Sequence, residues 1–205
     1  MKTETRTDEY IASYLDGVAE IARSISQAEI AAVVDLFFEC WKNGRTIFLI
    51  GNGGSAGTAS HFACDLNKVT AVEGRKRLKA MSLVDNVPLL TALINDNGWE
   101  HLFTEQLMNF FQPGDVVCAF SVHGGTGSDQ AGLWSQNLLR AMDYAKRHGG
   151  KAVGIAGFDG GAFRRVADPC IVIPYHTTPH VESFHVVLHH LIAFRLREMI
   201  EAHEG

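Results

Sequence analysis

The chain has 205 residues, of which 46% are hydrophobic and 20% charged, which excludes an intrinsically disordered protein. Its formal net charge of −5 provides no basic footprint, so nucleic acid is not an expected ligand. We expect a single domain over residues 1–205, with a helical pair in residues 1–43 and an α/β core in residues 44–205.

The N-terminal part of the chain predicts two helices. Apolar residues recur at three- and four-residue steps over residues 10–25 and again over residues 27–42, where Asn43-Gly44 ends the pattern. This helical pair is longer than is needed to cover one face of a sheet with a single layer of helices. We therefore expect it to contribute to a subunit interface. Residues 1–10 are polar and lack the apolar segment of a signal peptide. Since no apolar run approaches the ~20 residues of a membrane span, we expect a cytoplasmic protein without membrane contact.

Five apolar runs predict β-strands, and helical patterns separate most of them. The strands are expected at residues 46–50, 78–83, 115–120, 151–156 and 170–174, and the further helices at about residues 56–66, 88–95, 99–111, 135–148 and 179–202. Continuous apolar runs are typical of parallel strands that are buried on both faces. The alternation predicts an α/β three-layer sandwich around a five-stranded parallel sheet. Ligands of such sheets bind beyond the C-terminal ends of the strands.

The segment Gly51-Asn52-Gly53-Gly54-Ser55 lies between the first predicted strand and a helix. A turn of this kind presents backbone N–H groups and a helix N-terminus to an anion. The segment lacks the spacing of the dinucleotide-binding and P-loop motifs, and no lysine is placed to reach a triphosphate. A single phosphate monoester is therefore the favoured ligand, and a tight structural turn is the alternative.

A second hydroxyl-rich turn follows the predicted strand that ends at Phe120. It contains Ser121, His123 and Thr126 among glycines, and Ser135 is expected to be the N-cap of the next helix. Hydroxyls and glycines where a strand meets a helix again favour an anion. Two such turns at adjacent strand ends strengthen the prediction of a phosphate site.

Four cysteines occur in apolar stretches, without a CxxC pair: Cys40, Cys64, Cys118 and Cys170. This usage predicts reduced, buried thiols, as in a cytoplasmic protein.

Histidines and carboxylates on two predicted helices could hold a metal ion. His61 and Asp65 are four residues apart and share one helix face. The last helix carries further candidates in an apolar background, namely Glu182, His185, His189 and His190. Two histidines and two carboxylates from separate helices would make a zinc or other transition-metal site. The alternative for each histidine is a hydrogen-bonded core residue, and spacing alone does not decide which of them bind.

Glu182 and His190 are about two helical turns apart, roughly 12 Å along the axis. One ion can reach both side chains only if they lean toward each other or if separate subunits contribute them.

Together these motifs resemble the sugar isomerase (SIS) domain of phosphoheptose isomerases. The likeness covers most of the chain and is carried by Gly51-Asn52-Gly53-Gly54-Ser55, His61-Phe62-Ala63, Asn95-Asp96, Gly114-Asp115-Val116, Gly157-x-Asp159-Gly160-Gly161, Ala167-Asp168 and the last helix. Members of this family convert sedoheptulose 7-phosphate to D-glycero-D-manno-heptose 7-phosphate. Proteins of this family look like homotetramers whose active sites lie between subunits and often hold zinc. The resemblance therefore implies the same fold, substrate class, cofactor and assembly here.

The resemblance also implies roles for single residues in binding the substrate. Asn52, Gly53 and Gly54 would line the substrate, and Ser55 would bind its phosphate. Asn95 and Asp96 would contact sugar hydroxyls. Further phosphate contacts would come from Ser121 with Thr126 or Ser135. His123 belongs to a longer segment that departs from the family pattern, and we expect it to reshape the sugar end of the pocket.

For the metal and the chemistry, the resemblance implies His61 as a zinc ligand. Asp65 stands where the family has a glutamate that serves as ligand and acid/base. Glu182 stands in the place of a glutamine, and His190 in the place of a catalytic, zinc-bound histidine. The expected metal ligands are thus His61, Asp65, Glu182 and His190, and the expected catalytic residues are Asp65, Glu182 and His190.

Three departures from the family pattern bear on the reaction. Asp65 is one methylene shorter than glutamate, which displaces its carboxylate by about an ångström, enough to change a proton-transfer geometry. Glu182 adds a possible base and a stronger ligand. A longer segment at residues 122–134 replaces a compact loop and puts the exact substrate in question. Our hypothesis is that Asp65 mainly holds the metal and that Glu182 shares the proton transfer.

The sequence thus predicts a ketose–aldose isomerase that acts on a sugar phosphate through an enediol. His190 with Asp65 or Glu182 would supply the acid–base groups. One alternative is a non-catalytic SIS-domain protein that senses a sugar phosphate or scaffolds a partner, as in relatives that have lost the acidic residue after His-Phe-Ala. The acidic Asp65 favours an enzyme. A third possibility is an isomerase of another phosphorylated sugar.

Overall fold

The computed structural model describes residues 6–125 and 135–203. Its centre is a five-stranded, wholly parallel sheet with strand order β2-β1-β3-β4-β5, which confirms the predicted fold class. The strands are β1 (Thr46–Gly51), β2 (Lys79–Ser82), β3 (Val116–Ser121), β4 (Lys151–Ala156) and β5 (Cys170–Val172).

The helices are α1 (Thr7–Ser24), α2 (Gln27–Lys42), α3 (Gly54–Lys68), α4 (Val87–Asn97), α5 (Leu102–Phe110), α6 (Gln136–Arg147), α7 (Phe163–Val166) and α8 (Thr178–Ala202), with a 3₁₀ turn, η1, at Trp99–His101. The single helix predicted over residues 99–111 is therefore divided into η1 and α5. The short α7 was not predicted because one turn is too short to show a helical period.

Alternating side chains of the strands supply two apolar cores, one on each face of the sheet. In β1, Ile47 and Leu49 point into the core formed with α2, α3 and α8, whereas Phe48 and Ile50 point into the core formed with α5 and α6. This alternation is the two-residue period of a strand, and it makes every residue from 47 to 50 apolar and buried. The sheet is the middle layer between these two groups of helices.

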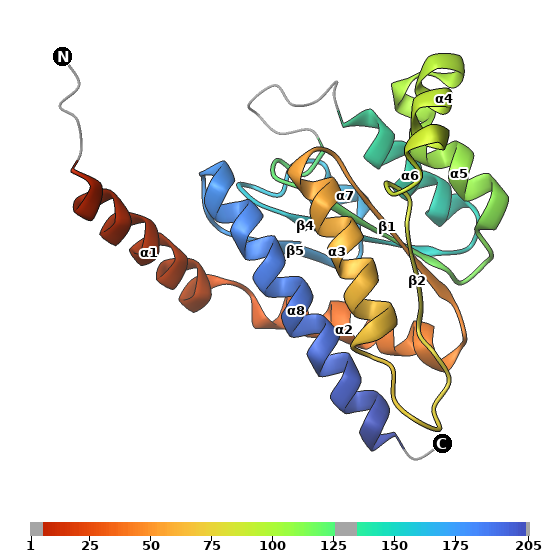
Figure 1. Cartoon of the computed structure of the whole chain (residues 1–205), viewed down its shortest axis with the longest axis horizontal. Coiled ribbons are helices and arrows are strands. Elements are labelled where there is room, and N and C mark those ends of the chain that lie inside the picture. The colour runs from red at the N-terminus through yellow and green to blue at the C-terminus, as the bar shows by residue number, and fades with distance from the viewer. Residues whose placement is uncertain (1–5, 126–134, 204–205) are drawn as a thin grey trace.

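Helices α3 and α8 lie side by side and run in the same direction across one face of the sheet (Figure 1). Glu182, near the start of α8, lies against Gly54 at the start of α3. Near their ends, the Arg197 guanidinium donates a hydrogen bond of 3.0 Å to the Val69 carbonyl. This parallel packing brings residues 61–65 of α3 next to residues 189–190 of α8.

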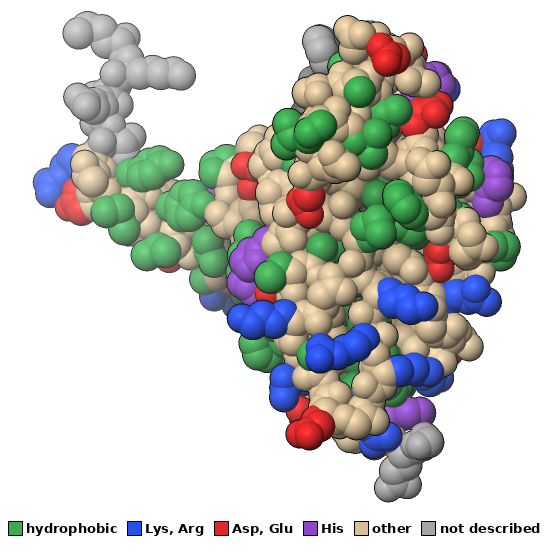
Figure 2. Space-filling view, turned by 45° about the vertical axis from the view of Figure 1, so that its right-hand side comes forward, with side chains coloured by type: hydrophobic (Ala, Val, Ile, Leu, Met, Phe, Trp, Pro, Cys, Tyr) green, Lys and Arg blue, Asp and Glu red, His purple; other side chains and the backbone are tan. Residues whose placement is uncertain are grey.

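Helix α1 projects from the body of the molecule (Figure 1), and its contacts with α8 begin at Tyr14. The Tyr14 hydroxyl lies 3.0 Å from the Ser183 hydroxyl, and the His180 ring lies 3.0 Å from the Tyr14 carbonyl. The first half carries exposed apolar side chains, Tyr10, Ile11 and Leu15, and Figure 2 shows hydrophobic side chains gathered along this arm. Within the described ranges, the helices lack the combination of length and apolar character needed to cross a bilayer.

Three of the four thiols are at least partly buried, and all four are free. Burial raises the pKa of Cys40 to about 12 and that of Cys170 to about 11. The expectation of four buried thiols is wrong for Cys64, which is exposed because it lies on the outward side of α3.

Candidate active site

The two glycine-rich turns leave the sheet at neighbouring positions. Strands β1 and β3 are adjacent, and Gly51 at the end of β1 pairs with Phe120 near the end of β3. The segments that follow, residues 52–55 and 122–125, therefore start at the same edge of the sheet. This arrangement is the one predicted from the parallel strands.

The first turn is shaped by the backbone of Gly53, which has φ +56° and ψ −124° and is the N-cap of α3. The Gly53 carbonyl accepts hydrogen bonds from the amides of Ala56 (3.0 Å) and Gly57 (3.4 Å), so the helix begins directly after the turn. Helix α3 begins two residues earlier than predicted, which places the buried Ser55 in its first turn. The positive end of the helix dipole thus lies at this turn.

A pair of asparagines fixes the first turn to the start of α6. Asn52 and Asn137 exchange two amide hydrogen bonds, of 3.1 and 2.8 Å, and the Asn137 oxygen also accepts the Leu138 amide at 2.9 Å. Asn137 is fully buried. Asn137 was not predicted as a site residue, since a single asparagine in the first turn of a helix gives no signal of a partner 85 residues away. Ser135 occupies the N-cap position of α6 as predicted, but its hydroxyl accepts no capping hydrogen bond.

The second turn is closely packed against the segment that follows β4. The buried Ser121 hydroxyl accepts a hydrogen bond of 3.2 Å from the Gly125 amide. Gly124 lies so close to the Gly160 backbone that an added Cβ would overlap it. The His123 ring lies 4.4 Å from the Phe158 ring, centroid to centroid. Thr126 lies outside the described residues.

Asn95 and Asp96 are exposed near the end of α4, a helix without a buried residue. The Asn95 amide donates a hydrogen bond of 2.7 Å to the Asp96 carboxylate. Their expected contact with sugar hydroxyls stays a prediction.

Three histidines surround Asp65 between α3 and α8. One carboxylate oxygen of Asp65, Oδ2, lies 3.8 Å from His61 Nε2, 3.1 Å from His189 Nδ1 and 3.4 Å from His190 Nε2. Candidate ligand atoms of these four residues all lie within 4.8 Å of one another. His189 is fully buried, whereas His61 and His190 are 48% and 44% exposed, so the cluster is open to solvent on one side. Imidazole nitrogens and a carboxylate oxygen suit zinc and similar divalent ions.

Glu182 lies apart from this cluster within the chain. Its carboxylate lies against Gly54, where an added Cβ would overlap it, at the N-terminus of α3. The helix dipole stabilises a negative charge at that position. The structure therefore brings Glu182 to the first turn, and a metal shared by Glu182 and His190 of one chain would have to span about two helical turns.

Two buried histidines have strongly shifted pKa values. Burial, with a smaller contribution from His189, lowers the pKa of His185 to about 3. Burial and the neighbouring His190 and His61 rings lower the pKa of His189 to about 4, against the opposing effect of Asp65. Both imidazoles are therefore neutral at pH 7, and a neutral ring is the form that binds a metal.

Comparison with known proteins identifies the family. The family model described as the SIS domain matches residues 9–157. The chain belongs to the SIS-domain family. Two phosphoheptose isomerases support this assignment. That of Geotalea daltonii is 32% identical over 195 residues (94% of this chain and 96% of that protein), and that of Aneurinibacillus thermoaerophilus is 32% identical over 198 residues (94% and 95%).

Another relative is the lincomycin biosynthesis protein LmbN of Streptomyces lincolnensis. It is 38% identical over 186 residues, which cover 89% of this chain but only 66% of LmbN. Among solved structures, phosphoheptose isomerase GmhA of Neisseria gonorrhoeae superposes with a TM-score of 0.80 at 24% identity, covering 94% of this chain and 97% of that one. The phosphoheptose isomerase of Francisella tularensis gives a TM-score of 0.79 at 22% identity, covering 93% and 96%. These structures show the same SIS fold.

The positive φ of Gly53 yields a prediction about the SIS turn. At both Gly53 and Gly57 an added Cβ meets no atom of the described residues within 4 Å, so among these residues the two positions differ in backbone conformation and not in space. We expect Gly53→Ala to lower the free energy of unfolding by about 1–3 kcal/mol, because alanine is strained there. Gly57→Ala, in the helix, should raise it by about 0.5–1 kcal/mol. Urea unfolding of both variants checks this, and equal effects would contradict the assigned conformation.

Burial of His185 predicts a pH dependence of stability. Between its unfolded pKa of 6.5 and its folded value of about 3, the unfolded chain binds a proton that the folded chain does not, so stability falls with decreasing pH. We expect His185→Phe to remove about 2 kcal/mol of the loss between pH 8 and pH 5. Urea unfolding of metal-free protein at both pH values measures it. As a control, His176→Phe, which changes an exposed histidine, should keep the full loss of unfolding free energy between pH 8 and pH 5. The same full loss in His185→Phe would contradict the prediction.

Proposed function

We propose that this SIS-domain protein is a ketose–aldose isomerase of a sugar phosphate, with sedoheptulose 7-phosphate as substrate and D-glycero-D-manno-heptose 7-phosphate as product. The main support is the meeting of two anion-type turns at adjacent strand ends with an acid–base group, Glu182, at the start of α3. Relatives named phosphoheptose isomerase, matched over nearly their whole length, support the same reaction.

The phosphate of the substrate would bind at the N-terminus of α3. Ser55, in the first helical turn, offers a hydroxyl, and the turn at Gly53 and Gly54 offers backbone amides with the positive end of the dipole. Ser121 and Ser135 would complete the phosphate contacts, and Asn52, held by Asn137, would contact the sugar. A fixed phosphate keeps the reacting carbons in register with the acid–base groups.

The isomerisation moves one proton between neighbouring carbons. A base removes the C–H proton next to the carbonyl to give an enediol and returns the proton to the adjacent carbon. A second group moves the hydroxyl proton. We assign the first role to Glu182, whose carboxylate lies beside Gly54, and the second to His190, which is 44% exposed next to Asp65.

Zinc is the proposed cofactor, one ion per site, with His61, Asp65 and His190 among the residues that would hold it. Asp65 Oδ2, which has no hydrogen-bond partner in the part of the chain that the structure describes, and the surrounding imidazoles form a donor set that suits such an ion. When bound, zinc would polarise substrate oxygens and stabilise negative charge on them. Asp65, one methylene shorter than a glutamate, would serve mainly as a ligand.

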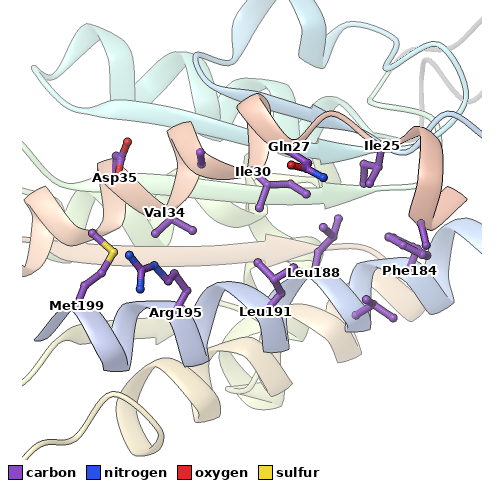
Figure 3. A pocket seen from close by; sticks show the side chains of 13 residues that line it. Ile25, Gln27, Ile30, Val34, Asp35, Phe184, Leu188, Leu191, Arg195 and Met199 are labelled. Atoms are coloured by element: carbon purple, nitrogen blue, oxygen red, sulfur yellow. The ribbon is translucent and has the colours of Figure 1, made fainter. Parts of the chain in front are cut away.

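We further propose a homo-oligomer, a tetramer by family likeness, located in the cytoplasm. An apolar groove of about 550 Å³ lies between α2 and α8, lined among others by Ile30, Val34, Leu188 and Leu191 (Figure 3). Such a lining suits an apolar helix and not a sugar phosphate. The projecting α1 of a second copy, with its exposed apolar side chains, would suit this groove. A second copy would also bring Glu182 and His190 of different chains toward one substrate.

A second candidate is the same reaction on another phosphosugar. LmbN, a relative at 38% identity, is named for lincomycin biosynthesis, and the segment at residues 122–134 is longer than the family loop. A non-catalytic sugar-phosphate sensor is the remaining alternative.

Purified protein incubated with sedoheptulose 7-phosphate and followed by NMR distinguishes these functions. We expect conversion to the aldose phosphate. Binding without turnover would favour the sensor. Absence of both would favour the other phosphosugar, which a panel of ketose phosphates would then identify.

For Glu182, we predict that Glu182→Gln lowers kcat about 10²- to 10⁴-fold, the usual contribution of a general acid–base group. The amide keeps the shape of the side chain but cannot accept the proton. Glu198→Gln is the matched control, since Glu198 lies on the same helix in an exposed ion pair with Arg195. Undiminished turnover in Glu182→Gln would remove Glu182 from the mechanism.

For Ser55, we predict that Ser55→Ala weakens sugar-phosphate binding about 10- to 100-fold, the usual range for a hydrogen bond to a charged group. Isothermal titration with the substrate measures the change. Ser24→Ala is a suitable control, because the Ser24 hydroxyl donates within α1, to the carbonyls of Glu20 (2.9 Å) and Ile21 (3.5 Å). Unchanged affinity in Ser55→Ala would contradict the phosphate site at this turn.

A further inference from the structure

We propose that His189 is a metal ligand, so that His61, Asp65, His189 and His190 of one chain supply four ligands to a divalent ion such as zinc, without Glu182. The family resemblance assigns no role to His189. The inference deepens the proposed function and rests on it only for the expectation that a metal is bound at all.

The distances around Asp65 agree with a common coordination centre. Zinc binds nitrogen and oxygen at about 2.0–2.1 Å, so neighbouring ligand atoms of a tetrahedral site lie about 3.3 Å apart. The separations from Asp65 Oδ2 are 3.1 Å to His189 Nδ1, 3.4 Å to His190 Nε2 and 3.8 Å to His61 Nε2. These three separations lie on either side of the expected 3.3 Å between neighbouring ligand atoms. By this measure His189 Nδ1 fits the coordination centre as well as the atoms of His61 and His190 do.

The direction of the side chains also points to a ligand. Although His189 Nδ1 lies at hydrogen-bond distance from Asp65 Oδ2, neither atom has a hydrogen-bond partner among the described residues. The two groups are therefore close but not aimed at each other, as expected for ligands aimed at a shared centre. Buried polar atoms without a partner are costly, and a bound cation would satisfy both.

Apart from the Asp65 cluster, the described surroundings of His189 are apolar. Its ring is fully buried, 5.5 Å from the Phe62 ring, and the same face of α8 carries the buried Leu188 and Ile192. An aliphatic residue would fill this position without an unpaired nitrogen. The rings of His61 and His190 lie 4.5 and 4.2 Å from the His189 ring, so all three imidazoles meet at Asp65.

Glu182 is not needed in this ligand set. Its carboxylate lies against Gly54, about two helical turns before His190 on α8. A site completed by His189 leaves Glu182 free for proton transfer. It also makes metal binding a property of the single chain.

The experiment counts histidine ligands in the full-length protein loaded with Co²⁺. In proton NMR spectra recorded in water, each coordinated imidazole gives one paramagnetically shifted N–H signal. We expect three such signals from the unaltered protein and two from His189→Ile, with Co²⁺ affinity weakened at least 10-fold. His185→Phe, which changes another buried histidine of the same helix, and Glu182→Gln should keep three signals.

Two signals from the unaltered protein, three from His189→Ile, or no stoichiometric Co²⁺ binding would each overturn the proposal. If His189→Ile fails to fold, the count in the unaltered protein still decides between two and three imidazoles. This outcome is independent of the isomerase assay, because counting the coordinated imidazoles requires no turnover. If the third imidazole were missing, any turnover measured with sedoheptulose 7-phosphate would still stand.

Discussion

The parallel packing of α3 against α8 is the contact on which the candidate site depends. Both helices start at the ligand-binding edge of the sheet and run in the same direction, so residues near their starts meet at the first turn and residues two turns further meet at Asp65. An antiparallel α8 would have placed its histidines far from Asp65. The direction follows from the β5-to-α8 connection, because a short link from a parallel strand starts the helix at the C-terminal edge of the sheet.

The same packing separates two chemical environments along one helix pair. At the start of α3, backbone amides and the helix dipole favour anions. Around Asp65, the carboxylate and three imidazoles, of which the buried His189 ring is neutral, favour a cation. A sugar phosphate matches both environments, because its phosphate suits the anion-binding turn and its carbonyl oxygen, at the other end, suits a bound cation. The distance between the two environments within one chain is the physical reason for proposing that a second copy takes part in the reaction.

The elements of the fold could be predicted because their signals are local. Buried parallel strands such as β3 and β4 are continuous apolar runs, and the turn at Gly51–Ser55 is recognised by its glycines. Helix limits were less certain: η1 and α5 share one apolar pattern, and only the left-handed backbone of Gly98, with φ +90°, marks their irregular start. Exposure of Cys64 depended on the rotation of α3, which an apolar neighbourhood in sequence does not specify.

The sequence by itself determined the SIS fold, the two turns and the residue types of the site, because period, glycine spacing and motif are properties of adjacent residues. Only the tertiary structure decided which side chains meet. Asn137 holds Asn52 across 85 residues, Glu182 lies at Gly54, and His189 lies beside Asp65. His189 and His190 are neighbours in the chain, yet one is fully buried and the other 44% exposed. Such differences of burial and distance arise from the packing of one helix on another, which no local pattern contains.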